Sequence, residues 1–319
     1  KGVTIALIDT PVDLSDPELA GANIVDKSRC TLEPSQTSSP HGNWMAALLV
    51  SQNYGVAPDA TLYTYQTATD GAASSGSCKQ GANKLDRMEN LLNQAIDDGA
   101  QIISISLSNN ERSSEIKWAI TRAINEGVII VSSSGNEAIY DDFSHLGRWS
   151  GVVGVTAINT DGTFASYSSW GNGVVTAAVG GPVTIRDANT GELTTTSGTS
   201  NATALVSGML ALARQKWPEA TTNQILQSLV RSGLNPNHEW NQYTGYGAID
   251  GGGLVIDDPS QYPDENPLLN KPGGSEPTAD EVADYADGIV NPTETTGLPD
   301  PYVYRGADDQ VVLYHSDLK

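Results

Sequence analysis

Apolar, β-branched runs alternate with segments of helical periodicity through the first 255 residues of the chain. The runs that predict buried strands cover residues 3–9, 101–108, 127–136 and 151–158. Continuous Val and Ile runs are typical of parallel strands that are covered on both faces. Apolar spacing of about 3.6 residues predicts helices over 84–100 and 113–127, and residues 204–213 predict a buried helix because they are apolar nearly all round. This alternation predicts an α/β fold, a doubly wound, mainly parallel β-sheet with helices on both faces.

An acidic, Pro-rich C-terminal extension follows over residues 256–319. Within it the sequence predicts a linker, a short helix and a hairpin, which cover residues 256–277, 278–290 and 301–315 in turn. Thr278 and Glu281 have the spacing of a capping box, which predicts where the helix begins. The alternative is that the extension is mostly a disordered acidic spacer.

The charge of the chain limits the partners that it can bind. Its 319 residues include 17 Lys and Arg against 38 Asp and Glu, a formal net charge of −21. This charge disfavours nucleic acids and anionic membranes, because both would be repelled. No apolar run is long enough to predict a membrane span. The chain opens on a strand-like segment with no signal peptide, which fits a cytosolic protein or a mature form that has lost its leader.

The two cysteines, Cys30 and Cys78, both lie in polar, Ser-rich segments. Free cysteines are usually buried in apolar surroundings, so this context favours a disulfide between them. Two unrelated exposed thiols are the alternative. Two cysteines alone are too few for a metal site.

Four polar residues stand where an open α/β sheet binds its ligands, at the carboxyl ends of strands. Asp9 and Asn136 end predicted strands, and His41 and Ser200 each head an apolar helical run. A serine hydroxyl becomes a nucleophile when a neutral imidazole takes its proton, and a carboxylate orients that imidazole. A side-chain amide and a backbone N–H can then stabilise the oxyanion. Taken singly, such residues are more often helix caps, turn residues or packed core residues.

Seven motifs surround these residues in a fixed order. They are ALIDTPVD around Asp9, HGNWMAALL at His41, GVAPDATLYTYQ at 55–66, ISISLS at 103–108, VIIVSSSGNEA at 128–138, FASYSSWG at 164–171 and SGTSNATALVSGMLAL at 197–212. Together they resemble the subtilisin-like serine proteases, the subtilase or peptidase S8 family, in which the triad follows the order Asp, His, Ser. The resemblance implies a subtilisin-like catalytic domain over about residues 1–255.

The resemblance also implies a role for each motif residue. Asp9 would be the orienting acid, His41 the general base, Ser200 the nucleophile and Asn136 the oxyanion donor, assisted by the Ser200 N–H. A peptide substrate would bind as an added strand between two walls of a cleft. The residues expected to form these walls are Ser106, Leu107 and Ser108 on one side, and Ser133, Ser134 and Gly135 on the other.

Departures from the family pattern concern specificity rather than the catalytic groups. Pro11, Asn43–Trp44 and Asn201–Ala202 replace residues that are usual beside the triad, and Ser108 replaces a glycine beside the S1 cleft. These departures predict that the protein cleaves a narrower range of substrates than a broad-specificity protease. The alternative is that they are ordinary variation within the family. Glu137, with Asp141 and Asp142 nearby in sequence, motivates the hypothesis that a basic P1 residue is preferred.

The family resemblance leads to expectations about metals, processing and activity. The helix after His41 runs straight on to the next strand, so we expect the family calcium site there to be absent, and no cofactor. The expected protein is a secreted, monomeric serine endopeptidase that has lost a propeptide and acts on peptides or proteins through an acyl-enzyme. The alternatives are a peptide-processing transpeptidase or macrocyclase on the same fold, and an inactive peptide-binding pseudoprotease.

Overall fold

A computed structural model describes most of the chain. The residues described are 2–32, 40–68, 76–80, 85–108, 112–140, 145–186, 191–272 and 275–286. The predicted hairpin over 301–315, and Asp141 and Asp142, lie outside these ranges.

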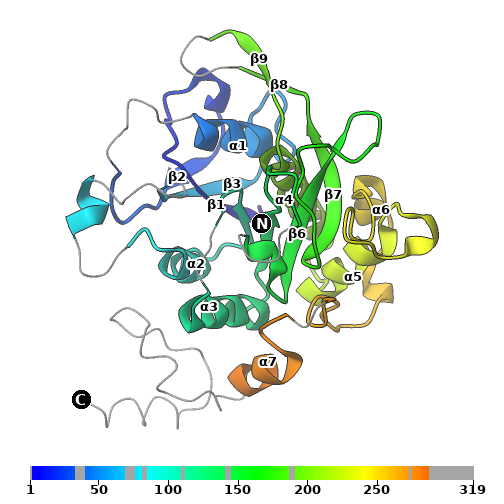
Figure 1. The fold of residues 1–319 in the computed structure, drawn as a ribbon. Helices are drawn as coiled ribbons and strands as arrows, with labels where there is room; N and C mark the ends of the chain where they lie inside the picture. Colours follow the sequence, from blue (N-terminus) through cyan, green and yellow to red (C-terminus); the bar gives the residue numbers. More distant parts are fainter. Residues whose placement is uncertain are drawn as a thin grey trace, which may run out of the picture.

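A seven-stranded parallel sheet forms the centre of the molecule (Figure 1), in the order β2-β3-β1-β4-β5-β6-β7. Its strands are β1 (Thr4–Asp9), β2 (Ile24–Asp26), β3 (Thr61–Gln66), β4 (Ile102–Ile105), β5 (Ile129–Ser133), β6 (Val152–Asn159) and β7 (Val174–Gly181). A separate antiparallel pair is formed by β8 (Val183–Arg186) and β9 (Leu193–Thr196). The four predicted strands are confirmed as β1, β4, β5 and β6, so the α/β prediction is confirmed as well.

Helices cover both faces of this sheet. They are α1 (His41–Val50), α2 (Met88–Asp97), α3 (Ser114–Asn125), α4 (Thr199–Lys216), α5 (Thr222–Ser232), α6 (Gly251–Ile256) and α7 (Ala279–Ala286). The three predicted helices are confirmed as α2, α3 and α4.

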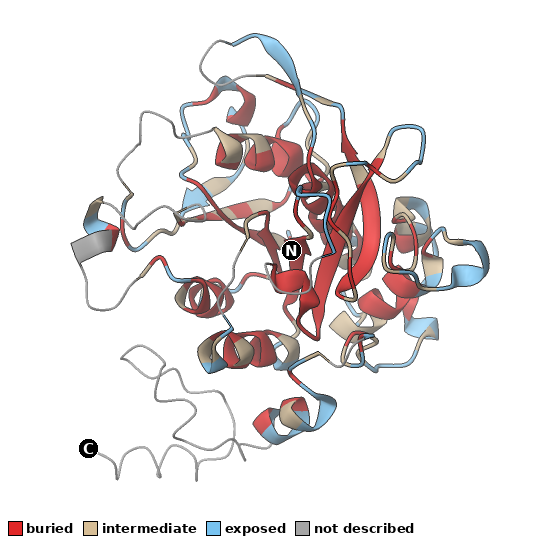
Figure 2. Cartoon of the chain, in the orientation of Figure 1, coloured by how far each residue is buried: buried red, intermediate tan, exposed pale blue. Residues whose placement is uncertain are grey.

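Alternate side chains of β1 enter two separate cores, as a strand covered on both faces requires. Ile5 and Leu7 pack in the core that contains α1, α4 and α5, whereas Ala6 and Ile8 pack in the core that contains α2 and α3. Figure 2 shows the buried strands between these helical layers. The strand ends are therefore held rigidly on both faces, and Asp9 is the last residue of β1.

The segment after α6 is not the extended linker that its composition predicted. A short 3₁₀ helix, η5 (Pro259–Gln261), is followed by the buried Leu268 and Lys271. Backbone carbonyls of the segment accept hydrogen bonds from Gln224, Gln227 and Ser150. An acidic side chain of the segment also takes part, because Asp264 Oδ1 accepts hydrogen bonds from Thr221 Oγ1 and Asn223 Nδ2.

The predicted capping box of the following helix is confirmed, at the start of α7. The Glu281 N–H donates to Thr278 Oγ1 at 3.2 Å, and the Thr278 N–H donates to the Glu281 carboxylate at 2.8 Å. The helix is attached to α3 by a Lys117–Glu281 ion pair at 2.7 Å and by stacking of Tyr285 on Trp118.

A disulfide joins Cys30 to Cys78, as predicted, and closes a loop of sequence separation 48 that carries α1. Within the described ranges, no helix combines the length and the apolar character needed to cross a membrane.

Candidate active site

The Asp9 carboxylate is held at the carboxyl end of β1 by its neighbour Thr10. Asp9 is 1% exposed, and its Oδ1 accepts hydrogen bonds from the Thr10 N–H at 2.7 Å and from Thr10 Oγ1 at 3.3 Å. Its other oxygen, Oδ2, is buried and forms no hydrogen bond within the described part of the chain. Such a buried carboxylate favours a cationic neighbour.

His41 is that neighbour, and it is the first residue of α1. Its Nδ1 lies 2.7 Å from Asp9 Oδ1, a distance for a short, charge-assisted hydrogen bond. Burial opposes protonation of the imidazole, but the charge of Asp9 and its hydrogen bond more than offset this, so the pKa of His41 lies above its ordinary value. The interaction fixes the tautomer with the proton on Nδ1, which leaves Nε2 to accept a proton.

Close approach of α1 to the end of β1 makes this pairing possible. The Gly42 N–H donates to Thr10 Oγ1 at 2.9 Å. A Cβ at Gly42 would lie 2.3 Å from the Thr10 carbonyl oxygen, so a side chain at this position would push the helix away from the strand. Asn43 adds a second attachment, because it accepts from the Asp13 N–H and donates to the Asp16 carboxylate.

Ser200 lies in the first turn of α4, where backbone N–H groups have no partner within the helix. Its hydroxyl donates to the Ser106 carbonyl oxygen at 3.3 Å. It therefore lies against the end of β4, and its hydrogen bond in this structure is to Ser106 rather than to His41. Catalytic hydrogen bonds of this kind often form only when substrate is bound.

Asn136 follows β5 and is oriented by the residue before Ser200. Asn136 Oδ1 accepts from the Thr199 N–H at 2.8 Å and from Thr199 Oγ1 at 3.1 Å. With the amide oxygen held by these two donors, the amide Nδ2 is the group left to donate. The positive end of α4 and this N–H can together favour a negative oxygen beside Ser200.

The predicted cleft walls lie at the ends of two neighbouring strands, β4 and β5, which pair in parallel. Residues 106–108 are here called the β4 wall, and residues 133–135 the β5 wall. Ser134 is fixed by its N–H to the Val155 carbonyl and by its hydroxyl to the Ser169 carbonyl. Gly135 has a φ of 97°, a left-handed conformation that favours glycine.

Two side chains flank Gly135 on the β5 wall. A Cβ at this position would lie 2.4 Å from Glu137 Oε2 and 2.7 Å from His145 Cε1. The Glu137 carboxylate accepts from Ser169 Oγ at 3.3 Å, which holds it beside the wall. An acidic group thus lies next to the predicted cleft.

Sequence reasoning did not identify several residues that hold the candidate residues in place. Thr10 and Thr199 each orient a neighbouring candidate residue, and Asn201 ties the start of α4 to β7 through the Gly180 carbonyl at 3.0 Å. Their positions directly beside Asp9 and Ser200 were the available signal. Among the residues described, no group of three or more His, Cys, Asp or Glu side chains could hold a metal ion.

Comparison with known proteins assigns the family. The model of the subtilase family matches residues 1–247. The chain is 31% identical over 266 residues to a thermostable alkaline protease of Halalkalibacterium halodurans, a match that covers 80% of this chain and 66% of that protein. The M-protease of Shouchella clausii is also 31% identical, over 80% of this chain and 63% of that protein. The chain thus spans about two thirds, or less, of these relatives. It belongs to the subtilase family of subtilisin-like serine proteases.

Solved structures share the fold at lower identity. A variant of the protease domain of PatA is 22% identical with a TM-score of 0.66, covering 79% of this chain and 93% of that one. The prenylagaramide maturation protease PagA is 23% identical with a TM-score of 0.65, covering 79% and 92%. These matches extend the fold assignment across most of the described chain.

Proposed function

We propose that this protein is a serine endopeptidase that hydrolyses peptide bonds through an acyl-enzyme on Ser200. The observation that carries the proposal is the 2.7 Å pairing of His41 with the buried Asp9, at the carboxyl end of β1, together with the position of Ser200 in the first turn of α4. Membership of the subtilase family supports the same chemistry. An inactive binding module would not need a buried carboxylate held against an imidazole.

In the proposed reaction, substrate binds between the β4 and β5 walls and the Ser200 hydroxyl turns toward His41. The oxygen of Ser200 attacks the peptide carbonyl while Nε2 of His41 takes its proton, and Asp9 stabilises the imidazolium. The oxyanion accepts from Asn136 Nδ2 and the Ser200 N–H. The C–N bond breaks as His41 gives its proton to the leaving amine. Water then attacks the ester, again with His41 as base, and frees the acid and Ser200.

We propose that specificity is narrowed and favours a basic P1 side chain. Glu137 supports this, because its carboxylate lies against Gly135 on the β5 wall. Ser108 adds a hydroxymethyl group to the β4 wall where the family has glycine. A scan of peptides that differ only at P1 measures the preference. Equal or better cleavage of hydrophobic P1 residues would contradict it, and Glu137→Gln is expected to remove the advantage of Lys and Arg.

We propose further that the protein acts outside the cell, as a monomer released from a propeptide and without a cofactor. The Cys30–Cys78 disulfide supports the location, since disulfides persist in oxidising compartments. The α1 helix runs without interruption over His41–Val50, which supports the expected absence of a calcium loop there.

Labelling with a fluorophosphonate probe tests the nucleophile directly. We expect stoichiometric labelling of Ser200 in the native chain and none in Ser200→Ala. A native, folded chain that never labels would overturn the proposal. The mass of products from a peptide substrate then separates hydrolysis, which adds a water, from transpeptidation or cyclisation, which does not.

A further inference from the structure

Lys271 carries a buried ammonium group far from the candidate active site in sequence. The residue is 8% exposed, and it lies in the segment after η5. Its Nζ donates to the backbone carbonyl oxygens of Gly147, of Val152 at 2.5 Å and of Gly173 at 3.0 Å. These three oxygens, here called the carbonyl site, all belong to the body of the molecule.

The carbonyl site has the chemistry of a cation site. A buried ammonium is costly unless its N–H groups are satisfied. All three N–H groups of the protonated form find an acceptor here, and within the described ranges every hydrogen-bond partner of Nζ is a neutral backbone oxygen. Burial lowers the pKa of Lys271 to about 7. The protonated form alone has a donor for each oxygen.

The carbonyl site joins three separate pieces of backbone. Gly147 lies in the 3₁₀ helix η3 (Leu146–Arg148), Val152 begins β6, and Gly173 precedes β7. Gly154 lies between them, since a Cβ there would be 2.3 Å from the Gly173 oxygen and 3.1 Å from the Gly147 oxygen. Backbone oxygens brought this close repel one another, so a positive charge between them stabilises the arrangement.

The site backs directly onto the predicted substrate cleft. A small cavity of about 20 Å³ is lined by Ser133 and Ser134 of the β5 wall and by Gly147 and Gly173 of the carbonyl site. Gly147 also lies against the β5 backbone, since a Cβ there would be 3.6 Å from the Ser132 carbonyl oxygen, so a shift of the carbonyl site would reach the β5 wall.

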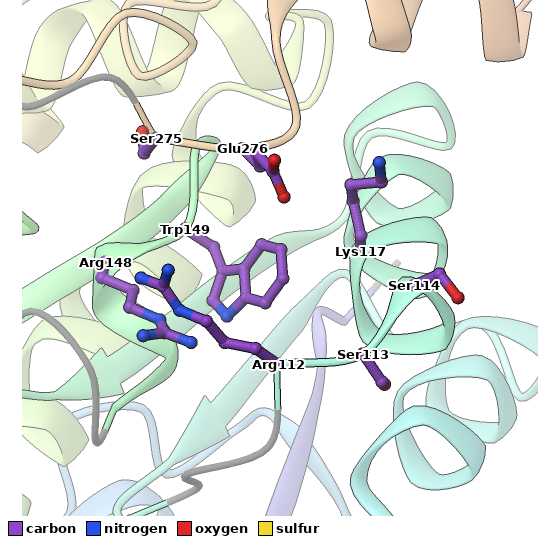
Figure 3. A pocket seen from close by; sticks show the side chains of 8 residues that line it. All are labelled: Arg112, Ser113, Ser114, Lys117, Arg148, Trp149, Ser275 and Glu276. Atoms are coloured by element: carbon purple, nitrogen blue, oxygen red, sulfur yellow. The ribbon is translucent and has the colours of Figure 1, made fainter.

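The segment that carries Lys271 is attached to η3 on its other side too. Ser150 donates its N–H to the Glu276 carbonyl at 2.8 Å, and its hydroxyl lies 2.7 Å from Ser275 Oγ. Figure 3 shows Ser275 and Glu276 facing Arg148 and Trp149 across a pocket of about 320 Å³. The C-terminal segment thus holds the η3 region at two places, one at Lys271 and one at Ser150.

We propose that the carbonyl site is a monovalent-cation site that the chain fills with its own Lys271, and that this tethered cation positions the β5 wall. Neutral oxygens without a carboxylate suit a single charge, as in potassium-selective carbonyl rings, whereas calcium sites add carboxylates. Ammonium or potassium is the class of ion that would replace the side chain. The positioning role rests on the proposed peptidase function, but the cation site does not.

Lys271→Ala tests the site by chemical rescue. In tetramethylammonium chloride, which is too large for the site, we expect the melting temperature to fall by about 5 °C or more, because three buried oxygens lose their donor. Ammonium or potassium at the same ionic strength should restore it with saturable dependence. KM for a peptide should rise several-fold, with a smaller change in kcat, and recover in the same salts. The melting temperatures of wild type and of Lys216→Ala, which removes an exposed lysine, should be the same in all of these salts.

Two results would overturn the proposal. One is a Lys271→Ala protein as stable as wild type in tetramethylammonium, and the other is a destabilised variant that no small cation restores. If the variant does not fold, reductive methylation of the native protein replaces it, and Lys271 should stay unmodified while Lys216 reacts. Equal modification of both would overturn the site. The melting temperature reports on the site even if the protein cleaves no peptide, so the two proposals fail separately.

Discussion

The pKa of His41 is set by two opposing effects of its immediate surroundings. Burial disfavours its charged form, while the charge of Asp9 and the 2.7 Å hydrogen bond favour it, and the second influence prevails. In the proposed mechanism, the imidazole therefore readily holds the proton that it takes from Ser200. Asn136 is governed in the same local way, because Thr199 holds its amide oxygen at 2.8 Å and leaves Nδ2 to donate.

Asp9→Asn should shift the pH dependence of activity. Only neutral His41 can act as the base, so kcat/KM rises with pH through the pKa of His41. The substitution removes the charge that raises this pKa and leaves the burial that lowers it, so the midpoint moves to lower pH. We also expect kcat to fall about 10⁴-fold. A pH profile with a peptide substrate measures both effects. Asp161→Asn, an exposed carboxylate, is the control, and an unmoved midpoint in Asp9→Asn would contradict the assignment.

Asn136→Ala should slow catalysis without weakening substrate binding. The amide N–H is expected to contact the oxyanion only in the transition state, so kcat falls about 10²- to 10³-fold while KM changes little. Steady-state kinetics of the variant and of Asn159→Ala, a half-buried amide at the end of β6, provide the comparison. A rise in KM at constant kcat would place Asn136 in ground-state binding instead.

Elements bring these residues together through their ends. The carboxyl end of β1 carries Asp9, and the amino-terminal turns of α1 and α4 carry His41 and Ser200. Both faces of β1 are buried by helices, so the strand cannot shift to relieve a local clash. The short distance between the end of β1 and α1 consequently depends on Gly42, because any side chain at this position would meet the backbone of Thr10.

Gly42→Ala should separate these two elements. Its Cβ would lie 2.3 Å from the Thr10 carbonyl oxygen, so α1 must move and the His41–Asp9 hydrogen bond must lengthen. We expect a loss of stability of about 1–3 kcal/mol, as for overpacking, together with reduced kcat. Denaturant unfolding and kinetics measure both quantities. Gly2→Ala is a matched control near the other end of β1, since its Cβ would meet Asp59 only at 3.6 Å. Equal behaviour of the two variants would contradict this account.

On the scale of the whole molecule, two features far apart in the sequence tie segments outside the sheet to the fold: the disulfide and the C-terminal extension. The Cys30–Cys78 disulfide closes the part of the chain that carries α1 and His41. The described part of the C-terminal extension contacts α5, the η3 region and α3, and it includes α7. The segment that carries His41 and the η3 region beside the predicted β5 wall are thus each attached from outside the sheet.

Replacing Cys30 and Cys78 together by serine should weaken the fold and spare the chemistry. Removing a cross-link of sequence separation 48 releases chain entropy in the unfolded state, with a cost of about 4 kcal/mol in the chain-entropy model. Denaturant unfolding should show the loss, with kcat at 25 °C nearly unchanged. Reductant should destabilise wild type and leave the double variant unaffected. Unaltered stability of the variant would contradict the prediction.

Local sequence determined much of this protein. Continuous Val and Ile runs specified buried parallel strands, because only a sheet covered on both faces can bury them. The chain order of Asp9, His41 and Ser200, with the residues around each, identified the family before any distance was known. Polar, Ser-rich surroundings indicated the disulfide. Each of these conclusions depends on residues that are near one another in the sequence.

Tertiary structure alone decided the contacts between distant segments. The sequence could not show that Ser200 donates to Ser106, that Thr199 turns the Asn136 amide, or that Glu137 lies against Gly135. Lys271 is the clearest case. The composition of the segment around it predicted a linker, but its Nζ donates to the carbonyl oxygen of Gly147, 124 residues away in the sequence. Backbone carbonyls carry no residue type, so a site built from them leaves no pattern in the sequence, and only the folded chain brings them together.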